Sequence, residues 1–365
     1  MLLHCDSFAT STMTGTYATS LPKWDDQPTS YYGSVRISDT AGRDGKGALL
    51  GGLMIDASYR YWTPVGKTFE PQGLSTALFT SASFFINSAG DTTVVPLMVL
   101  TTTPYSDRLD NVSGKTGLLI SYRPSTRAIL IERIATGSRS TLATSANNVV
   151  PENDWSRIEA RVDITGNAVA VRVNGVEVVA STSSLSTLAA GIRYVAFSVA
   201  AAAVDDALIY TSETGDAFNT YLGDVVIDCL LPNAAGAFSN FTPSSGSSAN
   251  FTYVDESSIN TSDYVQTTTA GAKDSYGFAD MTNLSATVLG VIVSTHLAAV
   301  GGTTRPFGAG LAIEGGTEVS GTAKRVPLTS SQAVSQTVFT TAPSGGAWTP
   351  AKVNAAEFGF KVTAN

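Results

Sequence analysis

Apolar and polar residues alternate most regularly between residues 155 and 210. Ile158, Ala160 and Val162 alternate there with charged side chains, which is the period of a β-strand with one buried face. Asn174-Gly175 separates two further alternating runs, and both residues tolerate the positive φ of a type I′ turn. The pattern therefore predicts antiparallel strands that include a tight hairpin.

Short apolar runs closed by turn residues recur along the chain, which is typical of an all-β sandwich or barrel. Apart from a short candidate helix near residues 352–357, no segment carries a helical apolar stripe. The strands predicted in the first half, besides those above, cover residues 78–86, 94–100, 118–122, 128–134 and 141–144. In the second half we predict a strand over 222–231 stopped by Pro232, a long polar loop over 234–250, and strands near 264–268, 287–295, 306–314, 334–340 and 357–362.

The composition changes after residue 210, where a polar, turn-rich stretch resembles a linker. We therefore predict an all-β protein with two antiparallel, jelly-roll-like β-sandwich domains. The predicted domains are residues 1–212 and a smaller one at 222–365, with residues 213–221 as the linker.

The charge content argues against several classes of partner. Charged residues make up 14% of the 365 residues, against about a quarter in an average protein, and the net charge is −8. A nucleic-acid partner would require a basic stripe, and Lys and Arg are scattered. The first residues lack the features of a signal peptide, and no apolar run approaches the length of a membrane span. We expect no nucleic-acid partner and no membrane insertion.

The chain has too few cysteines and histidines for a disulfide framework or for a catalytic set that contains them. Cys5 and Cys229 lie far apart in the sequence, which excludes a disulfide framework and favours two buried or half-buried thiols. His4 and His296 each lie alone in an apolar or small-residue strand. No Ser-His-Asp or Cys-His set can be proposed.

A set of short motifs follows a fixed order along the chain. The motifs are Asp6-Ser7-Phe8, Lys23-Trp24, Gly42-Arg43-x-Gly45-x-Gly47, Trp155-x-x-Ile158, Asn174-Gly175, Asp205-Asp206-x-Leu208-Ile209, Leu222-Gly223-Asp224-Val225, Leu231-Pro232-Asn233, Phe241-Thr242-Pro243-Ser244 and Ala356-Glu357-Phe358-Gly359. This ordered set resembles a family of tailed-bacteriophage virion structural proteins, whose first half resembles a concanavalin A/laminin G-type sandwich. The resemblance implies a non-enzymatic virion component of the tail, a fibre or a head decoration, made in the host cytoplasm.

Asp205-Asp206 are the candidate metal ligands, because sandwiches of the laminin G and lectin type can bind calcium at such a position. Calcium requires six or more oxygen ligands, and the sequence indicates only these two residues. In the alternative interpretation, one aspartate accepts N–H groups of a turn and the other faces solvent. We predict no metal and no cofactor.

Glycoside hydrolysis by a polysaccharide-degrading tailspike is the enzymatic alternative. It requires two carboxylates about 5–10 Å apart. Glu132 and Glu159 lie in alternating strands at positions expected to face solvent, and the Glu-x-Asp-x-x-Glu strand of concanavalin-like glucanases is missing. We therefore predict a protein without catalytic residues.

Two lysine motifs and two aromatic clusters complete the candidates. Gly66-Lys67-Thr68 and Gly114-Lys115-Thr116 end like phosphate loops, but Tyr61 and Leu109 replace the leading glycine, so neither is a nucleotide site. Tyr31-Tyr32 and Tyr59-x-Tyr61-Trp62 are able to stack on sugars, although core packing or subunit contact is the more frequent role. A host-surface glycan is therefore a candidate partner, and a stand-alone carbohydrate-binding lectin is a second alternative.

Small apolar residues at outward strand positions suggest assembly. Some strand faces are more apolar than one core can bury, at Ala168, Ala170 and the run Ala200–Ala203. Exposed apolar faces of this kind usually mark interfaces between subunits. We expect a homo-oligomer or a chain held by other virion proteins.

Overall fold

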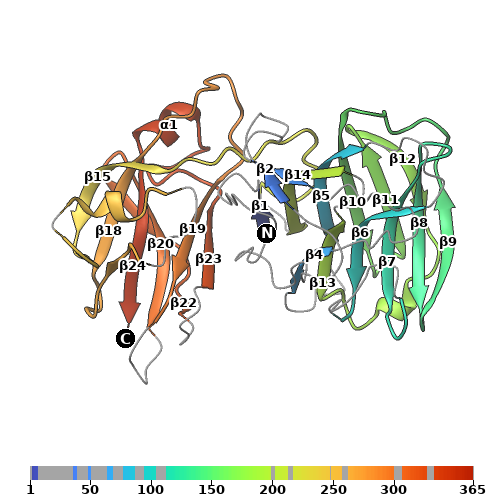
Figure 1. Cartoon of the computed structure of the whole chain (residues 1–365), viewed down its shortest axis with the longest axis horizontal. Coiled ribbons are helices and arrows are strands. Elements are labelled where there is room, and N and C mark those ends of the chain that lie inside the picture. The colour runs from blue at the N-terminus through green and yellow to red at the C-terminus, as the bar shows by residue number, and fades with distance from the viewer. Residues whose placement is uncertain are drawn as a thin grey trace. The chain divides into compact units, whose positions relative to one another are not determined.

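The protein is all-β and divides into two compact units, Met1–Ile227 and Asp228–Asn365 (Figure 1). The computed structural model describes residues 2–6, 36–38, 48–50, 64–68, 77–86, 94–103, 112–198, 202–212, 217–246, 248–256, 262–299, 306–326 and 333–364. Within these ranges, no helix is long and apolar enough to cross a membrane. The α-helix α1 spans only Pro350–Ala355, close to the predicted helical stretch.

The described strands of the first unit form two antiparallel sheets. In spatial order, sheet 1 contains β12 (Val176–Ser181), β11 (Ala168–Val173), β10 (Trp155–Asp163), β5 (Leu78–Ile86), β14 (Ala202–Thr211), β3 (Ala48–Leu50) and β2 (Arg36–Ser38), and β1 (Leu2–Asp6) pairs with β14. Sheet 2 contains β4 (Pro64–Thr68), β13 (Tyr194–Ser198), β6 (Val95–Thr101), β7 (Gly117–Arg123), β8 (Ala128–Ala135) and β9 (Ser138–Thr144). A short 3-10 helix, η1 (Ser186–Leu188), precedes β13.

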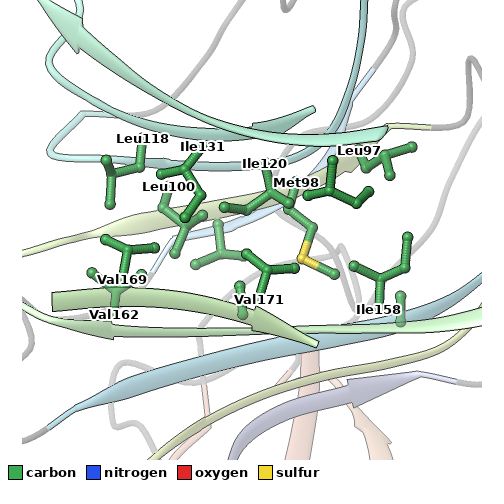
Figure 2. Close-up of a cluster of buried hydrophobic side chains, with 14 of the residues drawn as sticks. Leu97, Met98, Leu100, Leu118, Ile120, Ile131, Ile158, Val162, Val169 and Val171 are labelled. Carbon is green, nitrogen blue, oxygen red and sulfur yellow. The ribbon is translucent and has the colours of Figure 1, made fainter. Parts of the chain in front are cut away.

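The core of the first unit lies between these sheets (Figure 2). Ile158 and Val171 of sheet 1 point toward Leu118 and Ile131 of sheet 2, and all four are fully buried. Alternation along β10 therefore places one set of side chains in the core and the other set on the outer face of sheet 1. The sequence prediction of an antiparallel sandwich is confirmed.

The predicted hairpin is also present. Asn174 and Gly175 have φ values of 49° and 81° and connect β11 to β12, as a type I′ turn requires. The Asn174 side chain accepts a hydrogen bond from the Arg157 amide at 2.8 Å, which ties the turn to β10.

The second unit is built around sheet 3. In spatial order, sheet 3 contains β15 (Pro232–Ser239), β18 (Lys273–Phe278), β24 (Glu357–Ala364), β20 (Phe307–Glu314) and β21 (Thr317–Ser320), and β22 (Lys324–Arg325) pairs with β20. The other described elements are the pair β16 (Thr242–Pro243) and β17 (Val265–Gln266), the pair β19 (Val291–Leu297) and β23 (Ala333–Phe339), and the 3-10 helix η2 (Asn250–Tyr253). Val293 and Phe339 of the β19–β23 pair pack with Ala312 and Phe358 of sheet 3, which forms a second core.

The predicted strand over residues 222–231 is wrong. No strand is present at 221–231, and β15 instead begins at Pro232, the residue predicted to stop the strand, and runs into the loop predicted over 234–250. Proline is compatible with the first residue of an edge strand, because no ladder hydrogen bond from its nitrogen is needed there. Amides at Leu222, Gly223 and Ile227 are bonded to carboxylates of the first unit instead of to a neighbouring strand.

Candidate functional site

Residues 217–227, here called the strap, cross the outer face of sheet 1 and end the first unit. Part of this segment was predicted as a linker. Its described residues instead pack on the sandwich, and Phe218 is 4% exposed. The polar side chains on the outer face of sheet 1 meet the strap, so this cluster is the candidate site.

Glu159 of β10 binds the middle of the strap. Its Oε1 accepts hydrogen bonds from the Leu222 and Gly223 amides, both at 3.0 Å, while Oε2 has no hydrogen-bond partner among the described residues. The residue is only 1% exposed. Burial raises the pKa of Glu159 above its ordinary value of 4.5, although the two amides and the guanidinium groups of Arg157 and Arg172 oppose the shift.

Arg157 lies two residues before Glu159 on the same face of β10. Its Nη1 donates to the Asp206 carbonyl and its Nη2 donates to the Ser81 hydroxyl, each at 2.7 Å. The side chain is 2% exposed, so a cation is fixed beside the Glu159 carboxylate within the buried cluster. This arrangement connects β10 to β14 and β5.

Asp205 and Asp206 lie at a β-bulge in β14, where Asp206 has a φ of 50°. The Asp206 amide donates to Asp205 Oδ1 at 2.8 Å, and Asp206 Oδ1 accepts from the Ile227 amide of the strap at 2.8 Å. Each aspartate is 2% exposed, so the expectation that one faces solvent is wrong. No group of three or more His, Cys, Asp or Glu that could hold a metal ion exists within the described part of the chain.

Aromatic side chains close one end of the cluster. The Tyr221 hydroxyl donates to the Ala170 carbonyl at 3.1 Å, and the Arg172 guanidinium carbon lies 3.9 Å from the centroid of the Tyr221 ring. Phe79 stacks on Tyr210 and meets the edge of Tyr221. Burial raises the pKa of Tyr221 to about 12, and it also raises the pKa of Tyr210, so both are neutral hydrogen-bond donors.

Glu132 lies in sheet 2, away from this cluster. It is 7% exposed, and its Oε2 accepts hydrogen bonds from the Ser121 hydroxyl and from Arg139 Nη2, the latter at 2.7 Å. The prediction that Glu132 and Glu159 are solvated is therefore wrong. Both occupy outward strand positions, but other residues of the first unit pack over them: the strap over Glu159, and Ser121 and Arg139 beside Glu132.

Glu132 and Glu159 also do not form a pair. Their strand neighbours Ile131 and Ile158 point into the core from opposite sheets, so the two carboxylates lie on opposite outer faces of the sandwich. Packed sheets are about 10 Å apart, which places the carboxyl groups farther apart than glycoside hydrolysis requires.

The remaining candidates are scattered. Lys67 is in strand β4 and Lys115 is in the turn before β7, so neither lysine precedes a helix as a phosphate loop would. His4 is in β1, and His296 is half-buried in β19. Cys229 is half-buried in the second unit. The candidates Cys5 (side chain), Tyr31, Tyr32, Tyr59, Tyr61, Trp62, Ala200 and Ala201 lie outside the described residues.

The alanines proposed to form apolar faces have mixed surroundings. Ala168 and Ala170 are half-buried on the outer face of β11, where the strap reaches Ala170 through Tyr221. Ala203 is buried at 4% exposure.

A second buried carboxylate cluster, which the sequence did not indicate, lies in the second unit. Asp274 is fully buried and accepts hydrogen bonds from the Phe241 amide at 2.8 Å, the Tyr276 hydroxyl at 3.0 Å and the Asn250 side-chain amide. Glu357, which is half-buried on the neighbouring strand β24, accepts from the Ala237 amide at 2.7 Å. Alternation alone could not reveal the Asp274 site, because its partners Phe241 and Asn250 come from an irregular segment and a 3-10 helix.

Comparisons with known proteins identify no family for this chain. No family model matches the chain, and no curated protein matches it. A carbohydrate-binding module, CBM66 from Bacillus subtilis, is 10% identical with a TM-score of 0.29 and covers 49% of this chain and 92% of its own. An endo-β-1,4-glucuronan lyase from the fungus Trichoderma reesei is 12% identical with a TM-score of 0.35, covering 54% and 95%. A galectin-like protein of unknown function from Bacillus subtilis is 12% identical with a TM-score of 0.37, covering 57% and 95%.

The solved structures that resemble this chain thus include a lyase, a carbohydrate-binding module and a galectin from Caenorhabditis elegans. At this level of similarity, they carry no argument about what this chain binds or catalyses.

Proposed function

We propose that this chain is a non-enzymatic structural component of a tailed-phage virion, located on the tail, in a fibre or as a head decoration. One observation supports the proposal: residues of four motifs of the phage resemblance take part in hydrogen bonds in which a carboxylate accepts from a backbone amide. Asp206 and Leu222-Gly223 belong to two of these motifs, and both take part in the strap cluster. Phe241 and Glu357 belong to two others; in the second unit the Phe241 amide donates to Asp274, and Glu357 accepts from the Ala237 amide.

Buried carboxylates used in this way support a structural role. An enzyme of the glycosidase type requires an acid and a base that both reach a substrate. Glu159 is covered by the strap, and Glu132 lies on the opposite face with Ser121 and Arg139. The polysaccharide-degrading tailspike is therefore the less favoured alternative, and attachment to a host-surface glycan remains compatible with a structural role.

The location of the protein in a virion tests the proposal. Particles of the phage that encodes the chain would be purified and analysed by mass spectrometry and by immunogold labelling. We expect the chain to be present in a fixed ratio to the other virion proteins. Its absence from particles would overturn the proposal.

An activity assay separates the structural role from the enzymatic alternative. The purified chain would be incubated with the host capsular polysaccharide and lipopolysaccharide, and polymer length and new chain ends would be measured. We expect no change in polymer length. Shortening of either glycan would favour the tailspike and contradict the proposal.

A further inference from the structure

Asn174 is the only asparagine in the sequence that is followed by glycine. Such an asparagine can cyclise: the glycine nitrogen bonds to the side-chain carbon Cγ, the Cγ–Nδ2 bond breaks, and ammonia leaves with the proton of the glycine amide. Glycine has no side chain to hinder its own nitrogen, so the succinimide ring forms more readily before glycine than before other residues. Asn174 and Gly175 are both exposed at the tip of the β11–β12 hairpin, where solvent water reaches them.

The conformation of the turn keeps the two reacting atoms apart. Asn174 has a φ of 49°, and the first central residue of a type I′ turn, the mirror image of a type I turn, has a ψ of about +30°. Ring closure requires Cβ and the glycine nitrogen to eclipse one another about the Cα–C bond. At the ψ of this turn they lie nearly opposite one another, so the folded hairpin disfavours the reaction.

Two hydrogen bonds to Arg157 hold Asn174 in this conformation. The Asn174 amide donates to the Arg157 carbonyl at 2.8 Å, and Asn174 Oδ1 accepts from the Arg157 amide at 2.8 Å. The second bond uses the side-chain carboxamide itself, so Cγ cannot swing to the Gly175 nitrogen without losing it. Cyclisation therefore requires the tip of the hairpin to open first.

Hydrolysis of the ring gives two products, which fit the turn differently. Water that cleaves the ring at Cγ leaves an aspartate, whose carboxylate can still accept from the Arg157 amide. Water that cleaves it at the backbone carbonyl carbon leaves an isoaspartate, in which the chain runs through Cβ and Cγ and gains one backbone atom. A two-residue hairpin turn fixes the register of β11 with β12, so the longer backbone does not fit.

We propose that Asn174 is a latent modification site that records the opening of the β11–β12 hairpin. The folded turn protects the residue, and conversion to isoaspartate in the open chain prevents the hairpin from re-forming. The whole reaction consumes one water molecule and releases one ammonia. This inference does not depend on the virion role.

The rate of deamidation in the full-length chain tests the protection. The chain would be kept at one mildly alkaline pH, either folded or unfolded in guanidinium chloride, and the proteolytic peptide that contains Asn174 would be followed by mass spectrometry. We expect deamidation to be about 10- to 100-fold slower in the folded chain, because opening the tip breaks two hydrogen bonds. Equal rates in the two states would overturn the proposal.

Refolding of the aged chain tests the consequence. Chain that has deamidated while unfolded would be returned to native buffer, and limited proteolysis would digest the molecules that do not refold. We expect isoaspartate at position 174 to be depleted from the resistant fraction and aspartate at the same position to be retained. Equal isoaspartate contents in the resistant and digested fractions would contradict the proposal.

Asn174→Gly is the matched control, because glycine tolerates the positive φ and has no carboxamide to react. After the same ageing, this variant should keep its refolding yield, while the natural chain loses yield in proportion to its isoaspartate content. An equal loss in both chains would place the damage elsewhere and overturn the proposal. If Asn174→Gly does not fold, the distribution of isoaspartate between the two fractions decides the question by itself.

Discussion

Glu159 and Glu132 occupy similar positions in the two sheets of the first unit, and they have different partners. Each is a carboxylate on the outward side of a central stretch of strand, and each is buried. The Glu132 partners Ser121 and Arg139 lie 11 and 7 positions away, within the same meander. The amides that cover Glu159 lie 63 and 64 positions away, in the strap.

This difference shows how the outer face of a sandwich becomes a second buried layer. Neighbouring strands satisfy Glu132 as soon as the β7–β8–β9 meander forms. Glu159 is satisfied only when a later, irregular segment returns across the finished sheet. We therefore expect the Glu159 side of the sandwich to be the more sensitive to substitution and the more able to open.

The largest expected effect is that of Arg157→Ala. The substitution leaves the Asp206 carbonyl and the Ser81 hydroxyl without their donor and removes the cation beside the buried Glu159. We expect a loss of about 3 kcal/mol in the free energy of unfolding of the first unit. Urea denaturation of the full chain, with exchange of the β10 amides as the readout, measures it.

Arg139→Ala is the control for Arg157→Ala on the other sheet. The Arg139 side chain is 24% exposed, so solvent can replace part of its interaction with Glu132. We expect a loss below about 1 kcal/mol. Equal losses for the two arginines would show that the two faces do not differ.

Glu132→Gln is expected to have an intermediate effect. The glutamine oxygen can still accept from Ser121, but the charge that binds Arg139 is lost. We expect about 1.5 kcal/mol of destabilisation, measured by the same denaturation, with no change in strap exchange. Faster strap exchange in this variant would mean that the two faces are coupled.

Tyr221→Phe should have a smaller effect, confined to the strap. The ring keeps its contacts with Arg172 and Phe79, while the hydroxyl bonded to the Ala170 carbonyl is removed. We expect strap opening to become easier by about 0.5–1 kcal/mol, seen as faster exchange at Leu222 and Gly223. An equal effect on β5 exchange would argue that the hydroxyl stabilises the whole sheet.

The smallest expected effect is that of pH on the first unit. Because burial raises the pKa of Glu159 although the two strap amides lower it, the folded unit favours the protonated carboxyl group. The resulting stability is fully present below the ordinary value of 4.5 and is lost as the pH rises through the raised value. The charged groups that act on Glu159 are Arg157 on its own strand and Arg172 on β11, and the titratable groups that Glu159 affects are Tyr210 on β14 and Tyr221 on the strap.

Glu159→Gln tests this pH dependence, because glutamine retains an oxygen for the two strap amides and does not titrate. The free energy of unfolding of the first unit should fall in the natural chain as the pH rises through the raised pKa of Glu159, and it should fall less in the variant. A fall of equal size in both chains would assign the pH dependence to another group.

The sequence by itself determined the elements whose partners are adjacent in the chain. Alternation in β10 and the Asn174-Gly175 turn predicted the β10–β11–β12 meander, because strand period and turn geometry are local properties. The same reasoning found β5, β7 and β8 with nearly their observed bounds.

Only the tertiary structure decided which outward positions are buried and which apolar runs become strands. The residues at 222–231 resemble a strand, yet carboxylates on a distant sheet bind their amides and leave no neighbouring strand for pairing. Glu159 was predicted to be solvated because nothing in its own strand shows that residues 222–223 cover its side of the sheet. A period-2 pattern specifies the face of a sheet to which a side chain belongs, whereas a segment that covers that face from afar leaves no periodic signal in the sequence.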